Sequence, residues 1–166
     1  NAGVSRGTLT GEPADLQAFQ SVFDTNVMGM VNTFAPFVAA LRNERRGTLV
    51  GVASIAGFRG LPGAGAYCAS KAAAIAYLES LRVELHGSGV AVVTLCPGFV
   101  ATPLTAKNPY RMPFILQPDR AAQLMARAIA QRRRFHVLPW QVAWTGRLLR
   151  VLPRPLFDRV VAGRKR

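Results

Sequence analysis

Acidic residues are scarce in this sequence. Its 166 residues include eight Asp and Glu against 21 Lys and Arg, which gives a formal net charge of +13. The imbalance lies at one end, because residues 1–110 hold six acidic and eight basic side chains, whereas residues 111–166 hold two and thirteen. The N-terminal part is therefore close to neutral, and the strong basicity belongs to the C-terminal part.

Cysteine, histidine and long apolar runs are also few. Cys68 and Cys96 are too few for a disulfide framework, so we expect two reduced, packed thiols in a cytoplasmic protein. His136 has no second cluster of metal ligands near it, and we expect no metal site. No apolar run of 18 or more residues is free enough of charge to predict a membrane span. Half of the residues are hydrophobic, which suits a folded domain.

Tyr67 and Lys71 form the most informative pair of residues in the chain. Residues i and i+4 of a helix share one face. An ammonium beside a phenol favours the phenolate, so the pair predicts a lowered pKa for Tyr67, and such a phenol can exchange a proton with a substrate oxygen. Ser54 closes an apolar run over residues 48–54 that predicts a buried strand. The end of such a strand is where open α/β sheets bind ligands.

Further periodic segments predict alternating helices and strands. Apolar residues recur at spacings of three and four over residues 15–41, which predicts a helix, and Pro36 is expected to kink or break it. An Ala-rich helix is predicted over 66–86, and a capped amphipathic helix over 118–130. Besides residues 48–53, strands are predicted over 90–96 and 135–138. We find no internal repeat.

Five short motifs follow one another in a characteristic order and spacing. They are Asn1-Ala2-Gly3, Asp24 to Gly29 with Asn26 inside it, Ala53 to Gly57, Tyr67 to Lys71, and Cys96 to Thr102. Together they make residues 1–135 resemble the short-chain dehydrogenase/reductase family. The resemblance implies an α/β, doubly wound parallel-sheet fold of the Rossmann type, of which this chain holds only the later strands and helices.

The resemblance also implies an activity and a set of site residues. It implies an NAD(P)-dependent oxidoreductase that interconverts a small-molecule alcohol and a carbonyl, with NAD or NADP as cofactor. The catalytic residues would be Asn26, Ser54, Tyr67 and Lys71, with Tyr67 as the general acid and base. The cofactor-binding residues would be Asn1, Ala2, Gly3, Tyr67, Lys71, Pro97, Gly98, Val100 and Thr102. Residues 103–117 would form a mobile segment over the substrate.

The family's glycine-rich dinucleotide fingerprint is absent, and so is the residue that selects between NAD and NADP. The first residue is Asn1 rather than Met. We therefore expect this sequence to be the C-terminal portion of a longer protein and to be inactive alone.

The family resemblance further implies a homodimer or homotetramer. In relatives, the helices that correspond to residues 15–41 and 66–86 pair across a two-fold axis into a four-helix bundle. Phe23 or Leu78 would then face the equivalent helices of a second subunit.

The C-terminal residues form a distinct basic segment. We divide the chain into residues 1–139, the portion of the dehydrogenase domain, and residues 140–166, an amphipathic extension rich in arginine. The extension fits a helix that completes the core or a subunit interface, and it also fits peripheral membrane contact. Nucleic acid is not expected as a partner, because no nucleic-acid-binding motif accompanies the charge. Two alternative functions stay open for the protein. One is a non-catalytic scaffold on the same fold, and the other is a module that binds a membrane surface through the basic extension.

Overall fold

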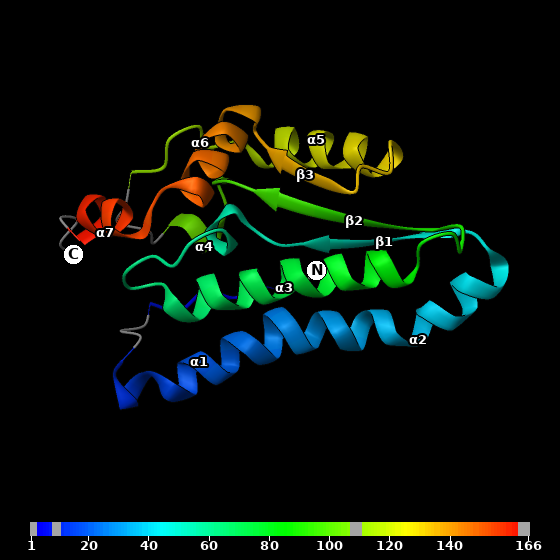
Figure 1. Ribbon diagram of the computed structural model, residues 1–166, viewed down its shortest axis with the longest axis horizontal. Helices are drawn as coiled ribbons and strands as arrows, with labels where there is room; N and C mark the ends of the chain where they lie inside the picture. Colours follow the sequence, from blue (N-terminus) through cyan, green and yellow to red (C-terminus); the bar gives the residue numbers. More distant parts are fainter. Residues whose placement is uncertain (1–2, 8–10, 107–110, 163–166) are drawn as a thin grey trace.

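The computed structural model describes residues 3–7, 11–106 and 111–162. Its centre is a three-stranded parallel sheet in the order β1 (Gly47–Val52), β2 (Val90–Pro97) and β3 (Phe135–Leu138). Helices α1 (Leu16–Phe23), α2 (Gly29–Glu44) and α3 (Gly65–Glu84) lie on one side of the sheet, and α5 (Pro118–Ala130) lies on the other (Figure 1). The α/β parallel-sheet fold predicted from the sequence is confirmed.

Strand β2 is apolar along its length because helices cover it on both faces. Val92 packs with Phe34, Leu49 and Leu78 in the cluster under α2 and α3. The next residue along the strand, Val93, points the other way and packs with Leu95 and Ala128 against α5. A parallel strand buried on both faces has no solvent side, which explains the run without polar alternation.

The long N-terminal helix is interrupted, but not where its proline predicts. Residues Asp24–Met28 form a π-helical turn between α1 and α2, whereas Pro36 lies within the uninterrupted α2. Helix α2 therefore has no break at Pro36, and the alternative expectation, a kink there, stays a prediction. An extra residue in the turn aims Asn26 inward, where it is 2% exposed, while Pro36 lies on the exposed side of α2. The helix ends at Glu44, followed by Arg45 in the left-handed conformation.

Leu78 is not available for contact with a second subunit. Its side chain is completely buried within this chain, where it fills the space over Gly51 of β1. A methyl group added at Gly51 would overlap the Leu78 side chain. The sequence-based expectation that Leu78 faces another subunit is wrong, because α3 uses this side for the sheet.

The basic extension forms two helices rather than one. Helix α6 (Trp140–Val151) follows β3 directly, and α7 (Arg154–Ala162) comes after a short break at Leu152 and Pro153. With the short α4 (Pro103–Ala106), they gather at the end of the sheet to which the strands point (Figure 1). Within the described residues, no helix combines the length and the apolarity that crossing a membrane requires.

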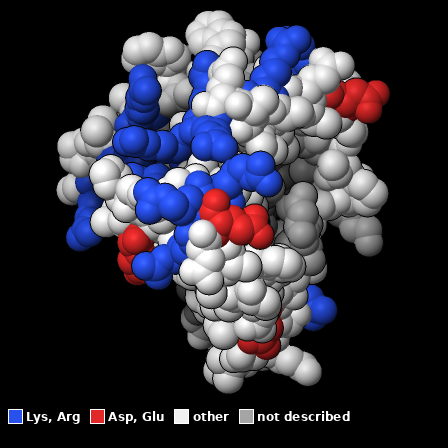
Figure 2. All heavy atoms as spheres, turned by 90° about the vertical axis from the view of Figure 1, so that its right-hand side faces the viewer, with Lys and Arg blue, Asp and Glu red and all other residues white. Residues whose placement is uncertain are grey.

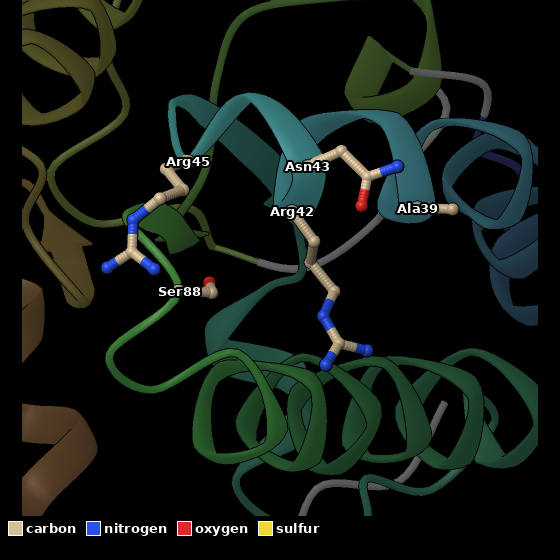
Figure 3. Close-up of a pocket in the computed structure, with 5 residues that line it drawn as sticks. All are labelled: Ala39, Arg42, Asn43, Arg45 and Ser88. Atoms are coloured by element: carbon tan, nitrogen blue, oxygen red, sulfur yellow. The ribbon is translucent and has the colours of Figure 1, made fainter.

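The opposite end of the molecule is strongly basic. Figure 2 shows Lys and Arg gathered over this end, where the exposed arginines Arg42, Arg45, Arg46, Arg132, Arg133 and Arg134 lie. A hollow of about 380 Å³ here is lined by Ala39, Arg42, Asn43, Arg45 and Ser88. Figure 3 shows its two guanidinium groups apart from one another rather than converging. This hollow therefore offers no focused binding site, and it lies far along the sheet from Ser54 and Tyr67.

Candidate active site

Ser54 lies just beyond the carboxyl end of β1, as predicted. The strand continues its pairing to Ala53, whose N–H donates to Leu95 O at 2.8 Å. Ser54 is extended and 7% exposed, and its Oγ accepts from the Ala56 N–H at 3.1 Å at the start of the turn Ile55–Gly57. A buried hydroxyl whose orientation is fixed by the backbone is suited to binding a ligand oxygen.

Tyr67 and Lys71 lie in the first two turns of α3, beside Ser54. The side chains of Tyr67 and Ser54 are hydrogen-bonded. Lys71 is 6% exposed, its Nζ lies 5.7 Å from the centroid of the Tyr67 ring, and it donates to Val52 O at 3.0 Å. The glycine-rich loop between β1 and α3 thus brings a strand end and a helix start together.

Asn26 connects the N-terminal segment to α3. Its Oδ1 accepts from the Val4 N–H at 2.9 Å, and its Nδ2 donates to Val4 O at 2.9 Å and to Ser70 Oγ at 3.0 Å. The Asn26 side-chain amide therefore exchanges two hydrogen bonds with the Val4 backbone, as the backbone of a neighbouring strand would. Gly3 lies against both Asn26 and Lys71, since a Cβ there would be 3.7 Å from Asn26 Oδ1 and 3.8 Å from Lys71 Nζ.

Ser70 is a site residue that the sequence analysis missed. It is completely buried, accepts from Asn26 and donates through Oγ to Tyr67 O at 2.8 Å. It thereby ties the π-helical turn to the backbone of the tyrosine. A serine three residues after Tyr67, in a helix otherwise rich in alanine, was the only signal for this role in the sequence.

The pKa of Tyr67 shifts in the direction opposite to the prediction. Burial raises the pKa of Tyr67 above its ordinary value, and the hydrogen bond with Ser54 offsets this only in part. Burial likewise lowers the pKa of Lys71. The expectation of a lowered Tyr67 pKa is therefore wrong, because desolvation outweighs the lowering by Ser54.

The segment after β2 runs on from the carboxyl end of the sheet and contacts the end of β3. Gly98 N–H donates to Leu138 O at 2.8 Å, and Val100 pairs with Leu116. Thr102 precedes α4, and its N–H donates to Thr105 Oγ1 at 3.0 Å. Of the predicted cofactor-binding residues, Asn1 and Ala2 lie outside the described residues.

Both cysteines lie near these groups as free, buried thiols. Burial raises the pKa of Cys96 to about 12 and raises that of Cys68. Thiols that stay protonated are poor nucleophiles, so neither is suited to covalent chemistry.

Arg59 holds the C-terminal extension against the loop that follows Ser54. Its Nη1 donates to Leu149 O at 3.1 Å and to Leu152 O at 2.9 Å, and its guanidinium lies 4.1 Å from the centroid of the Phe157 ring. Helix α6 also packs closely on this loop, because a Cβ at Gly146 would come within 2.7 Å of Phe58. The sequence analysis missed Arg59, whose partners lie about 90 residues further along the chain.

Replacing Arg59 by alanine is expected to destabilise the protein. Two hydrogen bonds and one cation–π contact would be lost, which predicts a fall of about 2–3 kcal/mol in the free energy of unfolding. Denaturant unfolding followed by circular dichroism measures this. Arg82→Ala is the matched control, since its ion pair with Glu79 at 3.4 Å lies at the surface and should contribute below about 1 kcal/mol. Equal effects of the two substitutions would contradict the role of Arg59.

A comparison with known families identifies the chain. The family model described as short chain dehydrogenase matches residues 1–112. The chain belongs to the short-chain dehydrogenase family. The resemblance noted in the sequence is thus confirmed.

Individual relatives extend the similarity toward the C-terminus. An uncharacterized oxidoreductase of Myxococcus xanthus is 44% identical over 158 residues, which are 95% of this chain and 62% of the relative. A short chain dehydrogenase from Burkholderia cenocepacia, solved in complex with NADP, has a TM-score of 0.84 and 25% identity, over 97% of this chain and 66% of that one. A family member from Burkholderia phymatum, solved in complex with NAD, has a TM-score of 0.75 and 29% identity, over 89% and 62%. The chain thus spans 62% to 66% of the length of these relatives.

Proposed function

We propose that the protein is an NAD(P)-dependent oxidoreductase that interconverts an alcohol and a carbonyl. The observation that carries the proposal is the convergence of Ser54, Tyr67, Lys71 and Asn26. These residues come from a strand end, the first turns of α3 and a π-helical turn. No two of these elements adjoin in sequence, so their convergence is a product of the fold.

Tyr67 would transfer the proton. During reduction its hydroxyl gives a proton to the carbonyl oxygen, and during oxidation the phenolate takes the proton from the alcohol. Ser54, already hydrogen-bonded to Tyr67, would donate to the same substrate oxygen and stabilise the charge that develops on it. The cofactor would supply or accept the hydride.

Lys71 and Asn26 would hold the cofactor side of the site. They would also return a proton to Tyr67 after it has given one to the substrate. The Lys71 ammonium has three hydrogens and gives one to Val52 O, so it can also donate to a ribose hydroxyl. Asn26 and Gly3 lie on the same side, where Gly3 leaves the space that a Cβ would fill. These residues fit a nicotinamide nucleoside, and Pro97, Gly98, Val100 and Thr102 would border its ring. Both NAD and NADP satisfy this part of the site, in line with the complexes of the two solved relatives.

The proposal is tested with the full-length protein encoded by the native gene. Nicotinamide fluorescence is followed against a panel of alcohols and carbonyls with each cofactor. Turnover of at least one substrate pair supports the proposal. Cofactor binding without turnover of any substrate would instead support a non-catalytic scaffold.

The two reaction directions are expected to differ in their pH dependence. Since burial raises the pKa of Tyr67, the phenol is protonated at neutral pH and is ready to give its proton. Carbonyl reduction should therefore vary little from about pH 7 to about pH 9, whereas alcohol oxidation should rise about tenfold per pH unit as the phenolate forms. Initial rates in both directions give kcat/KM at each pH and so measure this pH dependence. An oxidation rate that does not change with pH would contradict the role of Tyr67.

We further propose that the protein forms a homodimer or homotetramer through α2 and α3. Phe37 on α2 is 58% exposed and Val83 on α3 is 61% exposed, in contrast to the buried Leu78. Large apolar side chains on adjacent helices suit an isologous contact.

Phe37→Asp is expected to dissociate this oligomer, because an unpaired charge in an apolar contact is costly. Light scattering of the full-length protein measures the mass of the particle. Leu16→Asp is the control, since Leu16 is 72% exposed on α1 and not on α2 or α3, the two helices of the proposed contact. A wild-type monomer, or an unchanged mass in the Phe37→Asp variant, would contradict the proposal.

A further inference from the structure

Helix α6 carries apolar residues on two opposite sides. On its inner side, Val142 and Gly146 are buried, and a Cβ at Gly98 would lie 3.2 Å from Val142. On its outer side, Trp140, Trp144, Leu148 and Val151 expose 69%, 64%, 63% and 76% of their surface. At 3.6 residues per turn, these four form a single line opposite the buried residues. We call this line the outer stripe.

The fold does not account for the outer stripe. The inner side already attaches α6 to the core, and Arg59 holds its C-terminal carbonyls. Four large apolar side chains in a row on one exposed face exceed the isolated exposed residues that are ordinary in a folded protein. The next helix continues the pattern, because Phe157 and Val161 of α7 are buried while Leu156 and Val160 are 45% and 55% exposed.

Arginines accompany the outer stripe. Between residues 140 and 162 there are four arginines, Arg147, Arg150, Arg154 and Arg159, and one acidic residue, Asp158. The Arg147 guanidinium lies 5.3 Å from the centroid of the Trp144 ring, so its aliphatic stem runs beside the apolar line. Arg150 instead lies toward the core, with its guanidinium 5.2 Å from the centroid of the Phe58 ring. The stripe therefore has an apolar centre and a cationic border at Arg147, on a pair of helices that is basic as a whole.

We propose that the outer stripe docks on the surface of a lipid bilayer that contains anionic phospholipids. Helix α6 would lie in the plane of the interface, with its apolar side chains among the upper acyl chains and its arginines at the phosphate groups. Indole rings favour this depth because one edge is apolar and the other carries an N–H. Docking would set the carboxyl end of the sheet, with Ser54 and Tyr67, close to the bilayer.

Two other partners fit the surface less well. A second copy of the chain in an isologous contact would bring the same arginines together, and like charges oppose association. A nucleic acid backbone requires cationic groups at the centre of the contact, where this surface has tryptophan and leucine. An anionic bilayer suits both the apolar centre and the cationic border.

Vesicle binding by the full-length protein tests the proposal. Sedimentation with vesicles of equal parts phosphatidylcholine and phosphatidylglycerol is compared with vesicles of phosphatidylcholine alone. We expect binding to the mixed vesicles that weakens as salt is added. Trp140 and Trp144 are the two tryptophans among these 166 residues. Their own signal in the full-length protein is the difference in emission between the wild type and a Trp140→Phe/Trp144→Phe variant. That difference signal should shift to shorter wavelength on binding and be quenched by brominated lipid.

Paired variants separate the stripe from general basicity. Trp140→Ser/Trp144→Ser should weaken vesicle binding by about tenfold or more, while the phenylalanine variant retains most of it. Arg147→Ser/Arg154→Ser should also weaken binding by about tenfold or more. Arg132→Ser/Arg134→Ser removes the same charge from the opposite end of the molecule and should change binding little. Circular dichroism confirms that each variant is folded.

Five results would overturn the proposal. Three are equal binding to neutral and mixed vesicles, unchanged binding by the Trp140→Ser/Trp144→Ser variant, and equal losses from the two arginine pairs. The fourth is tryptophan emission that is already at short wavelength without lipid and depends on protein concentration. The fifth is tryptophan emission that responds to duplex DNA instead of vesicles. The concentration dependence would assign the stripe to a second copy, and the response to DNA would assign it to nucleic acid.

Discussion

Replacing Tyr67 by phenylalanine is expected to abolish turnover and leave the fold intact. The substitution removes the only proton that this position can transfer, and it changes the side-chain volume little. The hydrogen bond with Ser54 is lost, but the ring keeps its packing beside Lys71. We expect kcat/KM in both directions to fall by about a thousandfold, within the range for loss of a general acid–base group. Initial rates with the full-length protein measure this.

A second tyrosine on α3 supplies the control. Tyr77 is ten residues further along the same helix and packs against Phe34, and the centroids of these two rings are 6.4 Å apart. Tyr77→Phe removes the same oxygen atom from the same helix, away from Ser54, and should keep nearly full activity. Retention of more than about a tenth of the wild-type rate by Tyr67→Phe would contradict the assigned proton transfer.

Ser54→Ala should have the second largest effect on activity. A hydroxyl that is buried, oriented by the Ala56 N–H and bonded to Tyr67 can donate to a substrate oxygen as charge develops on it. Removal of such a donor lowers kcat by about 100-fold or more in comparable sites. We expect kcat to fall much more than KM rises, because the bond strengthens in the transition state.

The loss of Ser54 is distinguished from simple destabilisation by two measurements. Thermal unfolding should change little, since the Ser54 cap on the turn contributes about 1 kcal/mol. Ser54→Thr keeps the hydroxyl and should recover part of the rate, whereas Ser88→Ala at the far end of the sheet should have no effect. If Ser54→Ala retained its kcat and lost only stability, the hydroxyl would be structural.

Several elements could be predicted because their signals are local. Helix α5 begins and ends where the capped amphipathic pattern predicts, over Pro118–Ala130, and β3 matches the predicted strand over Phe135–Leu138. Helix α3 runs over Gly65–Glu84, within two residues of its predicted bounds at each end. In each case residues a few positions apart fix the backbone hydrogen bonds, so the pattern is visible in the sequence.

Asn26 was a candidate only through its family motif. As a single residue in a long helical pattern, it resembled an exposed asparagine. In the structure its partners are Val4 and Ser70, which lie 22 and 44 residues away in the chain. No local pattern identifies such partners, because they depend on how the π-helical turn packs on α3.

The order of the motifs and the spacing of Tyr67 and Lys71 determined the family and the candidate residues from the sequence alone. Only the tertiary structure decided the protonation of Tyr67, the burial of Leu78 over Gly51 and the attachment of the basic helices through Arg59. The physical reason is that desolvation and packing depend on every atom that surrounds a group. Periodicity, in contrast, depends on the backbone within one or two turns, which the sequence displays directly.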